Sequence, residues 1–279
     1  MKFIDFTKLL DRFVVFEGDN EHRPIEDYCQ TGLLVDAKGN PDAEIKTVIT
    51  GVSLRKELIL RAIKEKADAI IVHHPNGWWK SEKDKRLIGT HGEYVRLLMQ
   101  HGICLYGYHL HLDRHFLVGN NYTIARLIQM HDPKQRLRFV TFMDGIGVRF
   151  TGCPTEETLA SVFKYGYNVV GSKEAIKRLL DPSVDKHFAV CSGSGTSGLE
   201  EAKMLGVDVF ITGEIHESTT IFAEENDMAV IYAGHHRSEV FCVQMLADYI
   251  SGKGQFSDIP RDIRFEGVTA KFIDIDNPI

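Results

Sequence analysis

The chain has 279 residues, 43% of them hydrophobic, which is enough for one large domain or two ordinary domains with cores of their own. The net charge is −6 and the lysines and arginines are spread along the chain, which argues against nucleic acid as a partner. No apolar run approaches the roughly 20 residues that a membrane-spanning helix needs, so we expect no membrane association.

The five cysteines lie far apart and form no Cys-x-x-Cys pair. This pattern is typical of free thiols in a reducing compartment and argues against disulfides or a thiolate zinc site. Residues 1–16 carry scattered charges and no small-residue cleavage site, unlike a signal peptide. We therefore expect a soluble, cytoplasmic protein.

Short β-branched strands alternate with amphipathic helices in the first part of the chain. Ser53 is the expected N-cap of a helix that presents Leu60, Ile63 and Ala67 on one face. Strands are expected at 46–51, 68–72 and 103–107, and further helices at about 87–101 and from the residues after 119–121 to about 130. This alternation predicts an α/β fold, with mostly parallel sheets flanked by helices.

The middle of the chain has a different pattern. Residues 136–152 are predicted to form a hairpin, and Thr155 to be the N-cap of the next helix. Alternation resumes with strands at 207–212 and 228–233 and a helix from His235 to about 250. We expect two interlinked α/β domains: a larger one of residues 1–132 plus 191–279, and a smaller inserted α+β domain of residues 133–190.

Three of the predicted strands end in side chains that can bind metal. His73 and His74 end one strand directly before Pro75, His109 and Asp113 follow a second, and His235 and Glu239 follow a third. Ligands of open α/β sheets gather at the carboxyl ends of the strands. Residues four apart on a helix lie on one face, so His235 can converge with Glu239, and His109 with Asp113 if that turn is helical.

Imidazole and carboxylate without thiolate favour zinc, iron, manganese, cobalt or nickel over calcium. Two such ions about 3.5–4 Å apart form an arrangement used for hydrolysis. Each motif also has a simpler interpretation, because a strand-end histidine is commonly a surface residue and a His-x-x-x-Glu a solvated pair. Three independent strand ends in one parallel sheet favour the metal site.

Further motifs leave alternatives open. The loop from Gly193 to Gly198 could bind an anion at a helix N-terminus, or form a tight turn. Trp78 and Trp79 could stack on a base or contact another subunit. Thr212, Glu214 and His216 could support the metal site or bind substrate, although a solvated helix start explains the last two equally well.

Five stretches occur in an order that resembles one known family. They are 72–75 (VHHP), 105–113 (LYGYHLHLD) with 119–121 (GNN), 191–195 (CSGSG), 207–214 (VDVFITGE) and 233–236 (AGHH) with Glu239. In this order they resemble the Nif-three-like proteins, also called GTP cyclohydrolase I type 2 homologues. The resemblance covers the chain from about residue 30 to the end, and it is loose between 133 and 190.

The resemblance implies a dinuclear metal centre. Its implied ligands are His73, His74, Asp113, His235 and Glu239, with His109 beside them as a further candidate ligand. The family also implies a Nif-three-like fold of two α/β domains and a ring-shaped homohexamer.

We therefore expect a metal-dependent hydrolase with two divalent metal ions per chain, GTP cyclohydrolase-like, acting on a small nucleotide or heterocycle. His109 or Glu239 is expected to move the proton, with His216 as a further candidate. The alternative is a non-catalytic metal-binding or metal-delivery scaffold that works through protein partners. A metal-dependent phosphatase or nuclease is a third hypothesis, and the acidic net charge counts against long nucleic acids.

Overall fold

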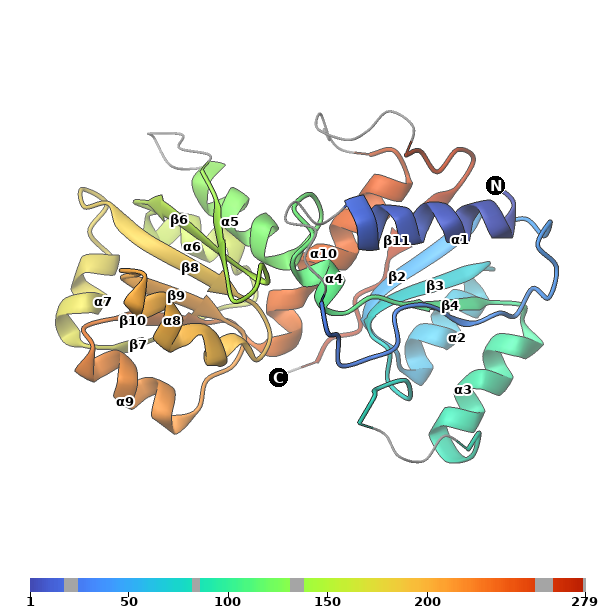
Figure 1. The fold of residues 1–279 in the computed structure, drawn as a ribbon, viewed down its shortest axis with the longest axis horizontal. Coiled ribbons are helices and arrows are strands. Elements are labelled where there is room, and N and C mark those ends of the chain that lie inside the picture. Colours follow the sequence, from blue (N-terminus) through green and yellow to red (C-terminus); the bar gives the residue numbers. More distant parts are fainter. Residues whose placement is uncertain (18–24, 82–85, 131–137, 254–262, 278–279) are drawn as a thin grey trace. The chain divides into compact units, whose positions relative to one another are not determined.

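The computed structural model describes residues 1–17, 25–81, 86–130, 138–253 and 263–277 (Figure 1). The chain divides into two compact units, each built on its own sheet. The first unit comprises Met1–Val118 and Cys242–Ile275, and the second comprises Gly119–Phe241 and the residues from Asp276. The two mixed sheets flanked by helices are the α/β class that the sequence predicts. Among the described residues, none of the helices combines the length and apolar composition that crossing a bilayer would require.

The sheet of the first unit has the strand order β1-β4-β3-β2-β11. Strands β2 (Thr47–Ser53), β3 (Ala69–His74), β4 (Cys104–Gly107) and β11 (Thr269–Phe272) are parallel, and β1 (Gly32–Val35) pairs antiparallel with β4. The first four residues of β3 are fully buried. Burial on both faces is typical of a parallel strand between two helical layers, and it explains the apolar run before His73.

Helices cover both faces of this sheet (Figure 1). Helices α2 (Lys56–Lys64) and α3 (Gly89–Gln100) pack Leu58, Ile59 and Leu98 against one face. Helix α1 (Phe3–Asp11) lies on the other face, with Phe6 edge-on to Tyr106. The second part of helix α10 (His235–Ile250) also belongs to this unit, and the carbonyl of Val243 accepts a hydrogen bond from Thr50 in β2.

Two predictions for α2 are wrong. Its N-cap is Arg55, because Ser53 still belongs to β2. Of the predicted face, Leu60 is wrong, because it is 47% exposed, whereas Ile63 packs against the core and Ala67, after the helix, is buried.

The sheet of the second unit has the strand order β5-β6-β8-β9-β10-β7. Its parallel strands are β8 (Lys186–Cys191), β9 (Val209–Thr212) and β10 (Ala229–Tyr232). The antiparallel strands are β5 (Val140–Phe142), β6 (Gly147–Gly152) and β7 (Asn168–Gly171). The helices are α5 (Asn120–Met130), α6 (Glu156–Val162), α7 (Lys173–Leu179), α8 (Leu199–Met204) and α9 (Glu217–Glu225).

Two predictions for this unit are confirmed. Strands β5 and β6 form the predicted hairpin, and Thr155 caps α6, where its side chain accepts from the Thr158 amide at 3.2 Å.

This division places residues 191–241 differently from the sequence-based expectation. Strand β9 pairs with β8, and β10 pairs with β9, so this stretch belongs to the second unit and not to the first. Helix α5, which was expected in the larger domain, also belongs to the second unit, and the expected boundary at 132–133 lies outside the described residues.

The parallel strands of both units are joined in the same way at their amino ends. In the first unit, Asp68 exchanges hydrogen bonds with Thr47 (amide to carbonyl 2.7 Å, amide to carboxylate 3.0 Å), and its carbonyl accepts from the Cys104 amide at 2.9 Å. In the second unit, the Asp208 amide donates to the His187 carbonyl at 2.8 Å, and the Asp208 carboxylate accepts from the His187 amide at 2.9 Å. The Asp208 carbonyl accepts from the Ala229 amide at 3.0 Å. One aspartate before the middle strand therefore ties together the starts of three strands in each unit. The sequence contains no exact repeat, and this shared pattern lies in the backbone bonds.

We expect Asp68→Asn to lower the free energy of unfolding by about 2 kcal/mol at pH 7, because Asp68 accepts charge-assisted bonds from Lys38 Nζ (2.8 Å) and the Lys46 amide (2.8 Å). Burial opposes ionisation, but these partners outweigh it and hold the pKa of Asp68 below its usual 3.8. The contribution is complete above that value and is lost as the pH falls through the lower folded-state pKa. Urea unfolding of both proteins across this range would measure the shrinking difference. Asp42→Asn, which removes the exposed ion pair with Lys2, should have little effect at any pH.

Candidate metal centre

Strand β3 carries two histidines at its carboxyl end. His73 is fully buried, and its Nδ1 lies 3.2 Å from the carbonyl oxygen of Tyr108. His74 Nδ1 lies 3.1 Å from the hydroxyl of Ser53, at the end of the neighbouring strand β2. The two ring centroids are 4.6 Å apart, so both imidazoles are on one side although they are consecutive in a strand. The chain turns at Pro75, as expected from the sequence where the strand bends.

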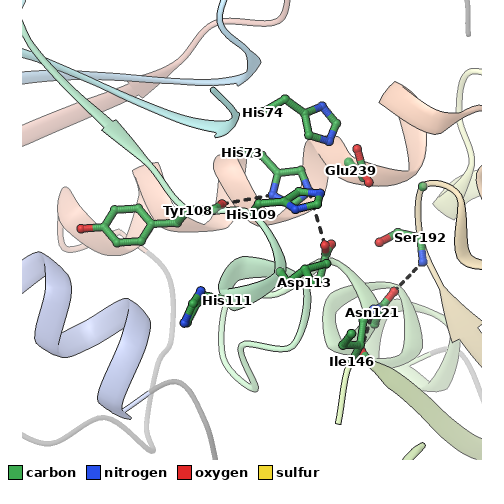
Figure 2. Close-up of polar contacts among 12 residues, drawn as sticks. His73, His74, Tyr108, His109, His111, Asp113, Asn121, Ile146, Ser192 and Glu239 are labelled. Atoms are coloured by element: carbon green, nitrogen blue, oxygen red, sulfur yellow. Dashed lines mark hydrogen bonds and ion pairs between the residues drawn. The ribbon is translucent and has the colours of Figure 1, made fainter. Parts of the chain in front are cut away.

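Two more candidates follow strand β4. The ring centroid of His109 lies 5.0 Å from that of His73 and 5.4 Å from that of His74. His73, His74 and His109 each offer a ligand atom within 4.8 Å of the others. Asp113 is buried, and its carboxylate lies 3.5 Å from His73 Nε2 (Figure 2). The turn that joins His109 to Asp113 is the short helix α4 (Leu110–Asp113), which confirms the helical turn considered from their spacing.

Asp27 contacts the candidate ligands but was not predicted from the sequence. This side chain is 4% exposed, and one carboxylate oxygen lies 2.9 Å from His109 Nδ1 while the other accepts the Leu110 amide at 2.9 Å and lies 3.4 Å from His111 Nδ1. Burial opposes its ionisation, but the two histidines outweigh burial and hold the pKa of Asp27 well below its usual range. It therefore stays a carboxylate. No local spacing marks this contact, which joins residues 82 positions apart.

Cys29 also lies at this end of the first unit. Asp27, Cys29 and His109 form a second group of potential ligands. Burial, reinforced by the nearby carboxylate of Asp27, raises the pKa of the Cys29 thiol to about 12.

In the second unit, His235 and Glu239 lie at the start of α10. His235 Nε2 is 3.2 Å from the carboxylate of Glu239, which is 3% exposed. On the other side of the ring, Nδ1 lies 2.8 Å from a carboxylate oxygen of Glu214, whose second oxygen accepts the Ser194 hydroxyl at 2.6 Å. Burial lowers the pKa of His235, but Glu239 and Glu214 outweigh it and raise the value to about 9. The two carboxylates make this a site that favours a cation.

Of the three supporting residues considered from the sequence, Glu214 contacts a candidate ligand. Thr212 is buried and donates to the Gly193 carbonyl at 3.2 Å, which is a structural bond. His216 caps α9, where its side chain accepts from a backbone amide of the first turn. The family stretch at Asn121 is structural too, because this side chain accepts the Ser192 amide and donates to the Ile146 carbonyl, both at 2.8 Å (Figure 2).

The glycine loop is a tight turn packed against the cluster of the second unit. Gly193 has φ +59°, and a Cβ there would collide with Glu239 Oε1 and lie 3.2 Å from His235 Nε2. Its amide donates to the Ser238 hydroxyl at 2.9 Å, and its carbonyl accepts the amides of Gly213 and Glu214 at 3.0 Å each. The backbone amide and carbonyl of Gly193 are thus both used within the protein. Glycine is required here because any Cβ would collide with Glu239.

The four histidines share one arrangement. In each, Nδ1 contacts an oxygen outside the cluster: the Tyr108 carbonyl, the Ser53 hydroxyl, or the carboxylate of Asp27 or Glu214. Histidines that bind metal through Nε2 are commonly oriented by such a partner at the other nitrogen. The donor set and its orientation therefore fit a divalent metal ion. His73, His74, His109 and Asp113 come together in the first unit, and His235 and Glu239 in the second.

Residues 1–265 match the family model described as Duf34/NIF3 (NGG1p interacting factor 3). The chain belongs to this family. It is 33% identical to the GTP cyclohydrolase 1 type 2 homolog of Pasteurella multocida, over 91% of this chain and 92% of that protein. Among solved structures it is similar to protein ybgI, titled as of unknown function, with 26% identity, a TM-score of 0.78 and full coverage of both chains. TTHA1606 from Thermus thermophilus has 25% identity and a TM-score of 0.74, again with full coverage of both chains.

We expect Gly193→Ala to weaken metal binding, because a Cβ would displace the carboxylate of Glu239. Gly206→Ala is the matched control: Gly206 also has positive φ (+77°), but a Cβ there meets nothing within 4 Å. Both variants should lose about 1–2 kcal/mol of stability from backbone strain. Metal titration and urea unfolding would separate the two effects, and equal metal affinity in both variants would contradict the role assigned to Gly193.

Proposed function

We propose that this protein is a metal-dependent hydrolase that acts on a small nucleotide or heterocycle. The proposal depends mainly on one observation, the four histidines that each have Nδ1 against an oxygen. Its family, whose relatives carry the name GTP cyclohydrolase 1 type 2 homolog, supports a hydrolytic reaction of this kind. GTP is therefore the first substrate to test.

We propose that two divalent metal ions bind per chain, of zinc, iron, manganese, cobalt or nickel. The proposed ligands are His73, His74, His109, Asp113, His235 and Glu239. Bound at such ligands, a divalent ion supplies Lewis acidity and lowers the pKa of water toward neutrality. Imidazole and carboxylate donors match all five candidate metals.

The protein's own groups would orient the ligands and move the proton. Glu239 is proposed to take up and return a proton, because its carboxylate has two oxygens and one of them could accept a proton while the other binds a metal ion. His109 is the other candidate for this step. The centroid of its ring lies 5.0 Å from that of His73 and 5.4 Å from that of His74, so we assign it first as a ligand.

We also propose a cytoplasmic homohexamer. All five cysteines are free and buried, as expected in a reducing compartment. Adjacent exposed apolar side chains before α3, Leu87 (60%) and Ile88 (57%), are available for contact with another copy. Light scattering on the purified protein would measure the number of chains in the assembly.

Metal analysis tests the centre. The protein purified gently without chelators should contain about two ions per chain, and His73→Ala should lose at least one of them because His73 is buried among the other ligands. His101→Ala, in an exposed residue at the end of α3, is the matched control and should keep the full content. Fewer than about one ion per chain, unchanged in His73→Ala, would rule out the proposed centre.

A substrate screen tests the reaction. The metal-loaded protein is incubated with GTP, other nucleotides and phosphoesters, and Glu239→Gln should lower kcat by about 10²–10⁴-fold on the substrate that is turned over. Circular dichroism checks that the variant keeps its fold. Bound metal without turnover of any compound would favour a metal-binding or delivery scaffold instead.

A further inference from the structure

Asp27 lies before β1 and outside the motifs that the sequence singles out. One oxygen of its carboxylate lies 2.9 Å from His109 Nδ1, and the other accepts a hydrogen bond from the Leu110 amide at 2.9 Å. The Leu110 amide begins α4 and has no acceptor within that helix. One buried carboxylate therefore holds the backbone of α4 and the ring of His109 together.

Two aromatic side chains lie beside the imidazole ring of His109, and Asp27 occupies one of its nitrogens. The Trp79 ring is perpendicular to the His109 ring, with centroids 5.2 Å apart, and the Tyr28 centroid lies 6.1 Å from that of His109. With Nδ1 at Asp27, Nε2 is on the opposite edge of the ring. His109 also offers a ligand atom to the group with His73 and His74. Because Nδ1 is occupied by Asp27, Nε2 is the nitrogen left for a metal ion.

We propose that Asp27 is a positioning residue that orients His109 as a metal ligand through Nε2. This inference rests on the proposed metal centre. The carboxylate accepts the Nδ1 proton, which fixes the tautomer with Nε2 unprotonated, and the bond to Leu110 keeps the carboxylate in place. His111 is a minor partner of the same group, because its Nδ1 is 3.4 Å from Asp27.

The first test uses the metal-free protein and the tautomer of His109. Nitrogen-15 NMR of histidine-labelled protein, at a pH where the imidazole is neutral, should show the proton of His109 on Nδ1. In Asp27→Asn this preference should weaken, because the charged acceptor is lost. A proton on Nε2 in the unmodified protein would overturn the inference, whatever the metal content.

The second test compares the affinity for Co²⁺, measured by competition with a chromophoric chelator. Asp27→Asn should bind about 10–100-fold more weakly and show a changed Co²⁺ absorption spectrum, as is usual when the partner of a ligand histidine is removed. His109→Ala should lower the affinity for Co²⁺ by at least the same factor. His111→Gln, which removes the weaker contact, should lose less than Asp27→Asn.

Asp68→Asn is the matched control, because Asp68 is also a partly buried carboxylate of the first unit that accepts backbone amides, and it contacts none of the candidate ligands in the described residues. It should lose stability and keep its Co²⁺ affinity. An unchanged affinity and spectrum in Asp27→Asn or in His109→Ala would overturn the inference. Failure of the unmodified protein to bind Co²⁺ would instead refute the proposed centre. If Asp27→Asn does not fold, the NMR result and His109→Ala still decide.

Discussion

The candidate ligands depend on hydrogen bonds made at the side of the imidazole ring that faces away from the clusters. A histidine can rotate and can carry its proton on either nitrogen, so a strand end alone does not make it a ligand. Here an oxygen lies at Nδ1 of each of the four histidines. These oxygens come from different strands and loops, so the orientation of the ligands depends on the folded strand ends of each unit.

The parallel sheets provide that edge. In both units an aspartate ties the amino ends of three parallel strands together, and this register brings the opposite ends of the same strands to one level. The first unit uses that level for His73 and His74, which end β3, and for His109, which follows β4. The second uses it for Glu214 and His235, which follow β9 and β10. The same backbone arrangement thus supports two different sets of side chains.

The sequence was informative wherever function follows from the position of a residue relative to a strand. His73, His74 and Asp113 were found because each follows a recognisable apolar strand, and their proximity within one unit could be expected from a parallel sheet. Asp27 could not be found in this way, because its contact to His109 spans 82 residues and the loop before β1 has no periodic pattern. Ser53 was assigned to a helix cap, whereas it ends β2 and its hydroxyl lies against His74.

The division of the chain was hard to predict for a related reason. Hydrophobic periodicity identifies strands but not their neighbours, and β9 fits either sheet by its composition. Its register with β8 and β10 is what assigns residues 191–241 to the second unit. Family motifs did not help, because they mark ligands and turns at strand ends rather than the pairing of the strands.

Electrostatics gives an independent reason to expect a cation at the cluster of the second unit. His235 lies between the carboxylates of Glu214 and Glu239, and Glu239 is nearly fully buried. A buried carboxylate without a compensating charge costs several kcal/mol. In the metal-free chain the compensation comes from a proton, since the pKa of His235 is raised to about 9. A divalent ion coordinated by Nε2 would replace that proton and add a second positive charge, so the same three side chains would be better satisfied with metal than without it.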